Sequence, residues 1–218
     1  MSKIKEILTF SKSKSSAEVF EQAELIATQL IKYCALKSFD RIHHFNALEF
    51  YINIPGVFED GVNSGGPTHM RDEQLQSGTF YCHTKSNNGK WSAPIFNRHG
   101  IDITAGDFSN NIHCGILIRH LGANDPKVKH MDGSGRALRV LLRGDSGFKA
   151  MNKTMPDWNW SKSELAYLEE LNGSSICEGK TQIIELSNPR NVIIEAKPRI
   201  GIDGKKNEHA PLRFVVKE

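Results

Sequence analysis

The sequence contains no long apolar run, and this absence sets the first limits on the class of protein. No stretch of its 218 residues comes near the roughly 18 consecutive apolar residues that a membrane helix needs. The basic N-terminus also lacks an apolar segment and a small-residue cleavage site, so we expect no secretion signal. These features predict a cytoplasmic protein with no membrane partner.

Cysteine is scarce and scattered. The four cysteines form no C-x-x-C pair, which indicates neither a zinc site nor a disulfide framework: Cys34, Cys82, Cys114 and Cys177. Small buried side chains are their simplest role. Among nine histidines only His43 and His44 are adjacent, and neighbours in a strand point to opposite faces. We therefore predict no metal and no other cofactor.

Neither sign of charge is in large excess. The formal net charge is +3, which is compatible with a nucleic-acid partner but does not require one. Hydrophobic residues make up 39% of the chain, which is ordinary for a globular protein that buries a core. The length suits one domain, or one domain with a helical preface.

Three stretches have the pattern of helices. Apolar residues at helical spacing, preceded by a capping-box pair at Ser15 and Glu18, predict a helix over residues 17–36. It would end a helical N-terminal preface of about residues 1–38. Residues 132–143 and 161–172 predict two more helices, the second with a capping box of its own.

The remaining patterned stretches predict strands. Apolar or alternating runs bounded by turn residues occur at 47–54, 78–83, 99–106 and 114–121 and in the C-terminal tail. Strands and helices follow one another without the regular alternation of a parallel sheet. This order indicates the α+β class.

The strand predicted at 47–54 pairs a carboxylate with an aromatic ring. Alternation puts four apolar side chains on one face: Leu48, Phe50, Ile52 and Ile54. The other face then carries Glu49 and Tyr51, about 7 Å apart along the strand. A half-exposed strand with a solvated glutamate accounts for this pattern. The alternative is a pocket in which the ring holds an aromatic ligand and the carboxylate activates a water molecule.

Two basic elements also favour a ligand-binding site. Three arginines share one face of the helix predicted at 132–143: Arg136, Arg139 and Arg143. Gly133 and Gly135 at its start would let backbone N–H groups approach a phosphate, although a solvated charged face also explains the pattern. Arg119 ends a strongly apolar strand, where an arginine usually has a specific partner.

Five segments, in order along the chain, resemble the alkyladenine DNA glycosylases, the 3-methyladenine glycosylase family. LEFYIN resembles the family's E-A-Y strand, and SGTFYCH resembles its P-G-T-L-Y-V-Y strand. GIDIT and GILIRHL resemble its M-N-I-S and V-L-L-R-A-L strands, and GSGRALRVL resembles its S-G-P-x-K-L-x-x-A-L helix. PRIGI followed by APLRFVV resembles its A-R-V-G-V and K-P-L-R-F-Y-V terminus. The resemblance covers about residues 40–145 and 195–216, and it implies a single mixed domain over 1–218 with a curved antiparallel β-sheet flanked by helices.

The resemblance also implies roles for individual residues. Glu49 falls on the family's general base, which activates water to attack the sugar C1′ of a flipped-out nucleotide. Tyr51 falls on an aromatic that stacks on the flipped base, and Arg119 on an arginine that holds the attacking water and the nucleotide backbone. The start of the helix falls on a contact with the DNA backbone, made here by Gly133, Ser134, Arg136 and Arg139, whereas Arg213 falls on a structural position.

A glycosylase needs a carboxylate and a ring in the same pocket. The target base must leave the stack, which costs a few kcal/mol, and stacking on an aromatic recovers about 1–3 kcal/mol per base. The transition state has oxocarbenium character, which a nearby carboxylate stabilises while it takes a proton from water. No lysine adjoins Glu49 in the sequence, so a Schiff-base lyase step is not indicated, and we expect an abasic site as the product.

The sequence departs from the family at the positions that line the base pocket. Asn63 stands nearest to the family's second stacking residue, a histidine, with His69 as a poorer match. His83 replaces the second tyrosine of the Y-x-Y strand, and Asp102 replaces an asparagine that reads the purine edge. The family's intercalating tyrosine has no clean counterpart. An inserted stretch occupies its place, in which Trp91 or Phe96 is the candidate wedge into the duplex.

These departures favour a base other than an alkylated purine. Asp102 can accept a hydrogen bond from a cytosine amine or a sugar hydroxyl, and Asn63 leaves room for bulk. We therefore expect double-stranded DNA with a hypermodified base, such as glucosylated hydroxymethylcytosine, as the partner of a monomeric enzyme; in these departures the chain is similar to an anti-phage branch of the family. The alternatives are a repair glycosylase for damaged purines, a non-catalytic nucleic-acid-binding module on the same fold, and a hydrolase of small nucleosides.

Overall fold

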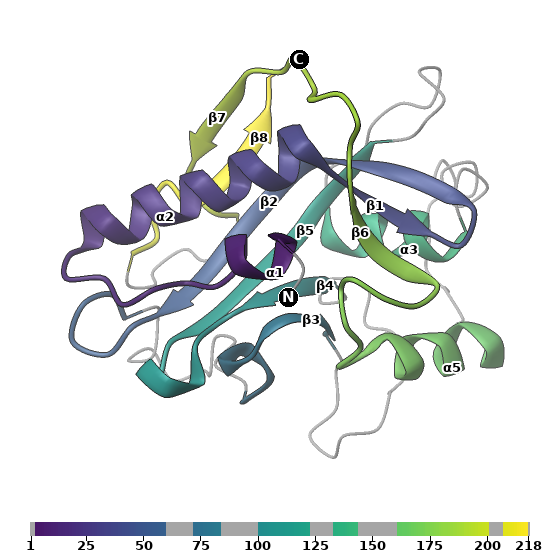
Figure 1. The fold of residues 1–218 in the computed structure, drawn as a ribbon, viewed down its shortest axis with the longest axis horizontal. Helices are drawn as coiled ribbons and strands as arrows, with labels where there is room; N and C mark the ends of the chain where they lie inside the picture. Colours follow the sequence, from purple (N-terminus) through teal and green to yellow (C-terminus); the bar gives the residue numbers. More distant parts are fainter. Residues whose placement is uncertain are drawn as a thin grey trace.

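The protein folds around one curled antiparallel sheet (Figure 1). The computed structural model describes residues 3–59, 72–83, 100–122, 133–143, 161–200 and 207–217. Its strands are β1 (Cys34–Ser38), β2 (Arg41–Asn53), β3 (Ser77–Cys82), β4 (Ile101–Ala105), β5 (His113–Gly122), β6 (Thr181–Glu185), β7 (Ile194–Lys197) and β8 (Arg213–Val216). The helices are α1 (Lys3–Ile7), α2 (Ser16–Thr28), α3 (Ser134–Arg143) and α5 (Lys162–Leu171). The predicted α+β class, with a curved antiparallel sheet flanked by helices, is confirmed.

Strand β2 is the centre of the sheet. The strand order is β3-β4-β5-β2-β1-β6, and β8 pairs with both β2 and β7. One edge of β2 pairs with β5 from His44 to Asn53. Its other edge pairs first with β1 and then, from Ala47 to Glu49, with β8. The backbone around Glu49 is therefore hydrogen-bonded on both sides.

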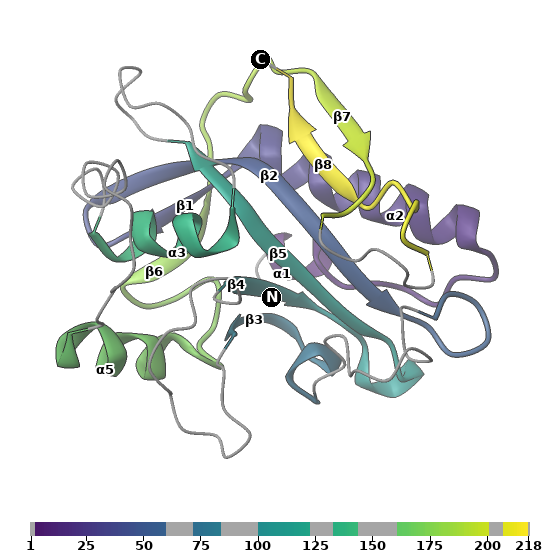
Figure 2. The same ribbon diagram turned by 180° about the vertical axis from the view of Figure 1, so that it is seen from behind.

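Helices α2 and α3 lie on opposite sides of the sheet. Helix α2 crosses in front of β2 in Figure 1, whereas α3 stands in front of the sheet in Figure 2, which is seen from behind. Beneath α2, the side chains of Leu48, Phe50 and Ile52 belong to the main hydrophobic core. The Phe50 ring packs edge-on against Phe10 and Phe214, with centroids 6.5 and 5.5 Å apart. The face of β2 that was predicted to be apolar is thus the core face.

The predicted helix over residues 17–36 is wrong at its C-terminal end. Helix α2 ends at Thr28, a π-helical segment spans Gln29–Tyr33, and Cys34 begins strand β1. Cys34 continues the four-residue apolar spacing, but the backbone of β1 pairs with β2 on one side and β6 on the other. Those two ladders of hydrogen bonds outweigh the local helical pattern.

Of the two predicted capping boxes, the structure forms one completely and the other in part. The Ser161 side chain and the Glu164 carboxylate form the full reciprocal box at the start of α5, as predicted. At α2, the Ser15 hydroxyl accepts from the Glu18 N–H, but the Glu18 carboxylate accepts from the N–H of Lys14 instead of Ser15. Ser15 is thus a cap without the reciprocal half of the box.

The other predicted elements agree with the structure to within a few residues. The runs at 78–83, 99–106 and 114–121 become β3, β4 and β5, and the tail contains β6, β7 and β8. The helix predicted from residue 132 begins at Ser134. Strand β2 is longer than predicted because it already starts at Arg41.

Candidate active site

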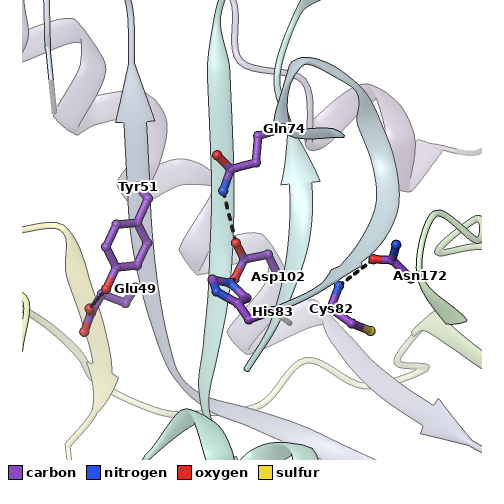
Figure 3. A network of polar contacts seen from close by, with 7 residues as sticks. All are labelled: Glu49, Tyr51, Gln74, Cys82, His83, Asp102 and Asn172. Carbon is purple, nitrogen blue, oxygen red and sulfur yellow. Dashed lines mark hydrogen bonds and ion pairs between the residues drawn. The ribbon is translucent and has the colours of Figure 1, made fainter. Parts of the chain in front are cut away.

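The candidate site lies on the face of the sheet opposite to the α2 core. Leu117 on β5 pairs with Glu49 on β2 and with Asp102 on β4. Directly paired residues on neighbouring antiparallel strands point to the same face. Glu49 and Asp102 are two strand spacings apart, which is about 10 Å. Figure 3 shows the two groups that they anchor, one around each carboxylate.

The Glu49 carboxylate is fully buried and held in a fixed orientation. The Tyr51 hydroxyl donates to Glu49 Oε1 at 2.5 Å (Figure 3). Ile200 N–H donates to Oε2 at 3.4 Å, and Arg119 Nε lies 3.8 Å from the same oxygen. A buried carboxylate is costly unless it is paired and hydrogen-bonded, and these three groups meet that requirement. Glu49 and Arg119, predicted as the catalytic pair, are therefore neighbours.

Tyr51 is both a hydrogen-bond donor and a wall of the site. Burial and the neighbouring Glu49 carboxylate raise the pKa of its hydroxyl, so the hydroxyl keeps its proton and donates it. The Arg199 guanidinium lies over the ring, 5.3 Å from its centroid. Because Arg199 covers that face, a stacked base would use the other face of the ring. The sequence assigned no role to Arg199, and no local signal links it to a tyrosine so far away in the chain.

The second group is built around Asp102, which is also fully buried. Its Oδ1 lies 2.7 Å from His83 Nε2, and its Oδ2 accepts from Gln74 Nε2 at 3.2 Å (Figure 3). After burial and Glu49, Asp102 also contributes to raising the pKa of Tyr51. Sequence reasoning named Asp102 and His83 but missed Gln74, which lies in a short 3-10 turn with no motif of its own.

Gly115 makes room for the contact between Gln74 and Asp102. It lies on β5 opposite Tyr51. A Cβ atom at Gly115 would be 2.4 Å from Gln74 Nε2 and 2.6 Å from Asp102 Oδ2. These separations are far below van der Waals contact, so any larger residue would push both side chains aside.

The end of β3 fixes the position of His83. Asn172 Oδ1 accepts from the Cys82 N–H at 2.9 Å, and the His83 N–H donates to the Gly100 carbonyl at 2.9 Å (Figure 3 shows the first contact). The His83 side chain is 11% exposed. Its ring centroid lies 5.1 Å from that of Tyr81. His83 is therefore the more accessible partner of the buried Asp102.

Helix α3 begins beside these groups. The Gly133 N–H donates to the Arg119 carbonyl at 2.9 Å, and Gly133 has a φ of +137°, a conformation that favours glycine. A Cβ atom at Gly100 would be 3.2 Å from the Ser134 Cβ atom. The first turn of α3 therefore lies next to both Arg119 and His83, and the Arg136 side chain of that turn is exposed.

The other predicted contacts lie outside the part of the chain that the structure describes. These are Asn63 in the base pocket and the two candidate wedges, Trp91 and Phe96. The backbone of Arg139 belongs to α3, but its side chain is not among those described.

Within the described ranges, three features can be checked: metal-ligand groups, disulfides and membrane-spanning helices. Among them, no three His, Cys, Asp or Glu side chains are grouped so that they could hold a metal ion. All four cysteines are free thiols. No helix of the described ranges is long and apolar enough to cross a membrane. Comparison with protein-family models and with curated proteins finds no match to this chain.

Proposed function

We propose that the protein is a monofunctional DNA glycosylase that flips out a modified base and hydrolyses its N-glycosidic bond. The observation that carries this proposal is the environment of Glu49, a fully buried carboxylate held by the Tyr51 hydroxyl and the Ile200 N–H beside Arg119. A purely structural strand has no need of a buried charge on its second face. A buried, oriented carboxylate next to an aromatic ring suits the activation of water against a ligand on that ring.

The chemistry follows from the positions of these groups. Glu49 takes a proton from a water molecule, whose oxygen forms a bond to the sugar C1′. The C1′–N bond breaks, and its electron pair leaves with the base. The negative charge of Glu49 stabilises the oxocarbenium character of the transition state, and Arg119 keeps the carboxylate in place. An abasic site and the free base are the products.

The start of α3 supports a polymeric substrate. Backbone N–H groups at a helix start bind phosphate oxygens, and Arg136 adds an exposed positive charge in the same turn. Both lie next to Arg119, within the reach of the phosphates that flank a flipped nucleotide. Binding to duplex DNA should therefore weaken steeply with salt.

The Asp102 group supports a polar base as the target. Its carboxylate, the His83 ring and the Gln74 amide form a hydrogen-bonded polar cluster, and Asp102 shares its face of the sheet with Glu49. Such a lining suits a base with hydroxyls or exocyclic amines better than an alkylated purine. We propose a hypermodified cytosine, such as glucosylated hydroxymethylcytosine in phage DNA, which would make the reaction an antiviral defence.

The test is to incubate the purified chain with three duplexes. One carries glucosylated hydroxymethylcytosine, one carries hypoxanthine or ethenoadenine, and one is unmodified. Released bases are identified by mass spectrometry and abasic sites by alkaline cleavage. We expect release from the first duplex only. Release from the second alone would make the protein a repair enzyme, and tight binding without release from any duplex would make it a binding module.

A further inference from the structure

We propose that Asn53 and His113 bind the hydroxyl groups of a substituent on the target base, and thereby select a base that carries a ring-sized, hydroxylated group. This inference rests on the proposed function and deepens it. It assigns the end of the site beyond Tyr51 to the part of the base that distinguishes it from an unmodified one.

Asn53 and His113 continue the row of site residues along the sheet. Asn53 follows Glu49 and Tyr51 at every second position of β2, so its side chain lies on the same face. It pairs directly with His113 on β5, which puts the two Cβ atoms about 5 Å apart on that face. Asn53 is 5% exposed and His113 is 9% exposed. Two polar side chains are thus buried side by side at the end of the row.

The two side chains differ from the rest of the row in their hydrogen bonding. Among the described residues, neither Asn53 Oδ1 nor His113 Nδ1 has a hydrogen-bond partner, although both atoms are buried. The buried oxygens of Glu49 and Asp102, in contrast, all contact protein groups. A buried polar atom without a partner costs free energy of folding, and an apolar pair would avoid that cost. The pair therefore points to a ligand that supplies the missing partners.

The chemistry of the two atoms favours hydroxyl groups as these partners. The Asn53 oxygen can only accept a hydrogen bond. Burial lowers the pKa of His113 more than the Asp72 carboxylate raises it, so the imidazole is neutral at neutral pH and Nδ1 either donates or accepts according to the tautomer. A hydroxyl both donates and accepts, and it therefore suits both atoms. A methyl group suits neither.

The distance from Glu49 indicates where on the base these hydroxyls lie. Asn53 is four residues beyond Glu49 on the same strand, a separation of about 13 Å. Under the proposed function Glu49 acts at the sugar C1′, and by covalent bond lengths the far edge of a pyrimidine lies only about 6 Å from that atom. An unmodified base on Tyr51 would therefore stop short of the pair, whereas a ring attached to the base would reach it.

One short turn borders both polar parts of the face. The 3-10 turn Asp72–Leu75 carries Gln74, which lies over Gly115 and contacts Asp102. The same turn carries Asp72, whose charge acts on His113. The Asp102 group and the pair of Asn53 and His113 therefore line neighbouring parts of one surface. We assign the first to the ring of the base and the second to its substituent.

The test compares DNA duplexes whose target bases differ in hydroxyl groups. One duplex carries cytosine with a hexose joined through a 5-hydroxymethyl group, the second carries a cyclohexane ring on the same linker, and the third carries 5-hydroxymethylcytosine alone. Affinity is measured by fluorescence anisotropy in the Glu49→Gln background, so that the DNA stays intact. We expect the hexose duplex to bind about 30-fold more tightly than the cyclohexane duplex.

Two variants and a control then locate this preference. Asn53→Leu keeps the size of the side chain and should reduce the preference to less than about threefold, while the ligand-free protein stays as stable as before or gains stability. His113→Phe keeps a ring without nitrogens and should show the same trend; it carries the test if Asn53→Leu loses folding. Asn188→Leu, at an exposed asparagine after β6, should keep the full preference.

The outcomes separate this inference from the proposed function. Equal affinity for the hexose and cyclohexane duplexes, or a preference that both variants keep, would overturn the role of the pair while release that depends on Glu49 remained. An equal loss of affinity for all three duplexes would show a structural role and would also overturn it. A preference that depends on Asn53, without base release by the wild-type protein, would support the pair as a hydroxyl-binding site and overturn the proposed hydrolysis.

Discussion

Both faces of β2 are buried, but they differ in chemistry. On one face, Leu48, Phe50 and Ile52 are at most 1% exposed and pack into the main core. On the other, Glu49 is 0% exposed and Tyr51 is 9% exposed, and they meet charged and polar groups. Burial alone therefore does not distinguish a core from a candidate site. The distinction lies in whether the buried side chains need partners.

Burial of the polar face costs more free energy than burial of the apolar face. Burying a charge costs several kcal/mol unless attraction and hydrogen bonds offset it, and apolar residues of the same volume often do equally well or better. Burying the Glu49 and Asp102 groups therefore costs free energy of folding that an apolar packing at the same positions would not cost. Local rules are broken most often at functional sites, which agrees with a catalytic role for this face.

The largest expected effect comes from removing the charge of Glu49. Glu49→Gln keeps the size of the side chain and an oxygen for Tyr51, so the thermal unfolding midpoint should change little. Base release should fall by about 10⁴-fold, since no group is left to take the proton from water. Single-turnover kinetics measure this loss. The matched control is Glu195→Gln on β7, where Lys197 and Lys217 hold the carboxylate and lower its pKa. Full activity of Glu49→Gln would contradict the proposed role of Glu49 in activating water.

The opposite pattern is expected on the core face. Phe50→Ala removes a fully buried ring that packs against Phe10 and Phe214, which should lower the free energy of unfolding by about 4 kcal/mol. Urea denaturation measures the loss. Activity per folded molecule should stay the same. Phe108→Ala, at a ring that is 79% exposed, should change stability by less than about 0.5 kcal/mol. Similar losses in the two variants would contradict the assignment of the core face.

Gly115→Ala tests the support of the Asp102 group. The added methyl overlaps the Gln74 amide and the Asp102 carboxylate, so stability should fall by about 2 kcal/mol and base release by about tenfold, while DNA affinity stays constant. The measurements are urea unfolding, single-turnover release and fluorescence anisotropy. Adding Gln74→Ser should restore part of the stability, because the shorter side chain makes room. A double variant as unstable as the sum of the two single variants would mean that the residues do not share this space.

The smallest effect is expected at the surface. Arg136→Ala should weaken DNA binding by less than about tenfold on every sequence and lower the slope of log affinity against log salt by about one. Titrations by fluorescence anisotropy at several salt concentrations measure both. Lys180→Ala, on the β6 side and paired with Glu170, is the control and should leave the slope unchanged. An unchanged slope for Arg136→Ala would contradict the proposal that the start of α3 contacts DNA.

Periodicity was sufficient to predict the two faces of β2. Alternation places Glu49 and Tyr51 together and opposite to Leu48 and Phe50, and the structure has this arrangement. The pattern is visible in a strand buried on both faces because one face remained polar. Periodicity failed around Cys34, where a helical spacing continues into a strand that is stabilised by its neighbours β2 and β6.

The partners that complete the site depend on tertiary structure. Gln74 meets Asp102 from 28 positions away, and the Ile200 N–H meets Glu49 from 151 positions away. The Ile200 contact uses a backbone group, which every residue except proline carries, so no residue type signals it. Gln74 is a polar residue in a turn, which is ordinary. Gln74 and Ile200 lie outside the strands, so only the folded structure shows that these groups converge on Asp102 and Glu49.

The position of each group in the sheet bears on how such proteins diverge over generations. Glu49 stands on the central strand, with ladders on both sides, whereas His83 directly follows β3 and Asp102 stands on β4, towards the end of the strand order. A substitution on β2 disturbs three neighbouring strands, whereas one at the end of β3 disturbs fewer. Under the proposed function, descendants of this protein can change the base that they admit while the residue that activates water is inherited unchanged.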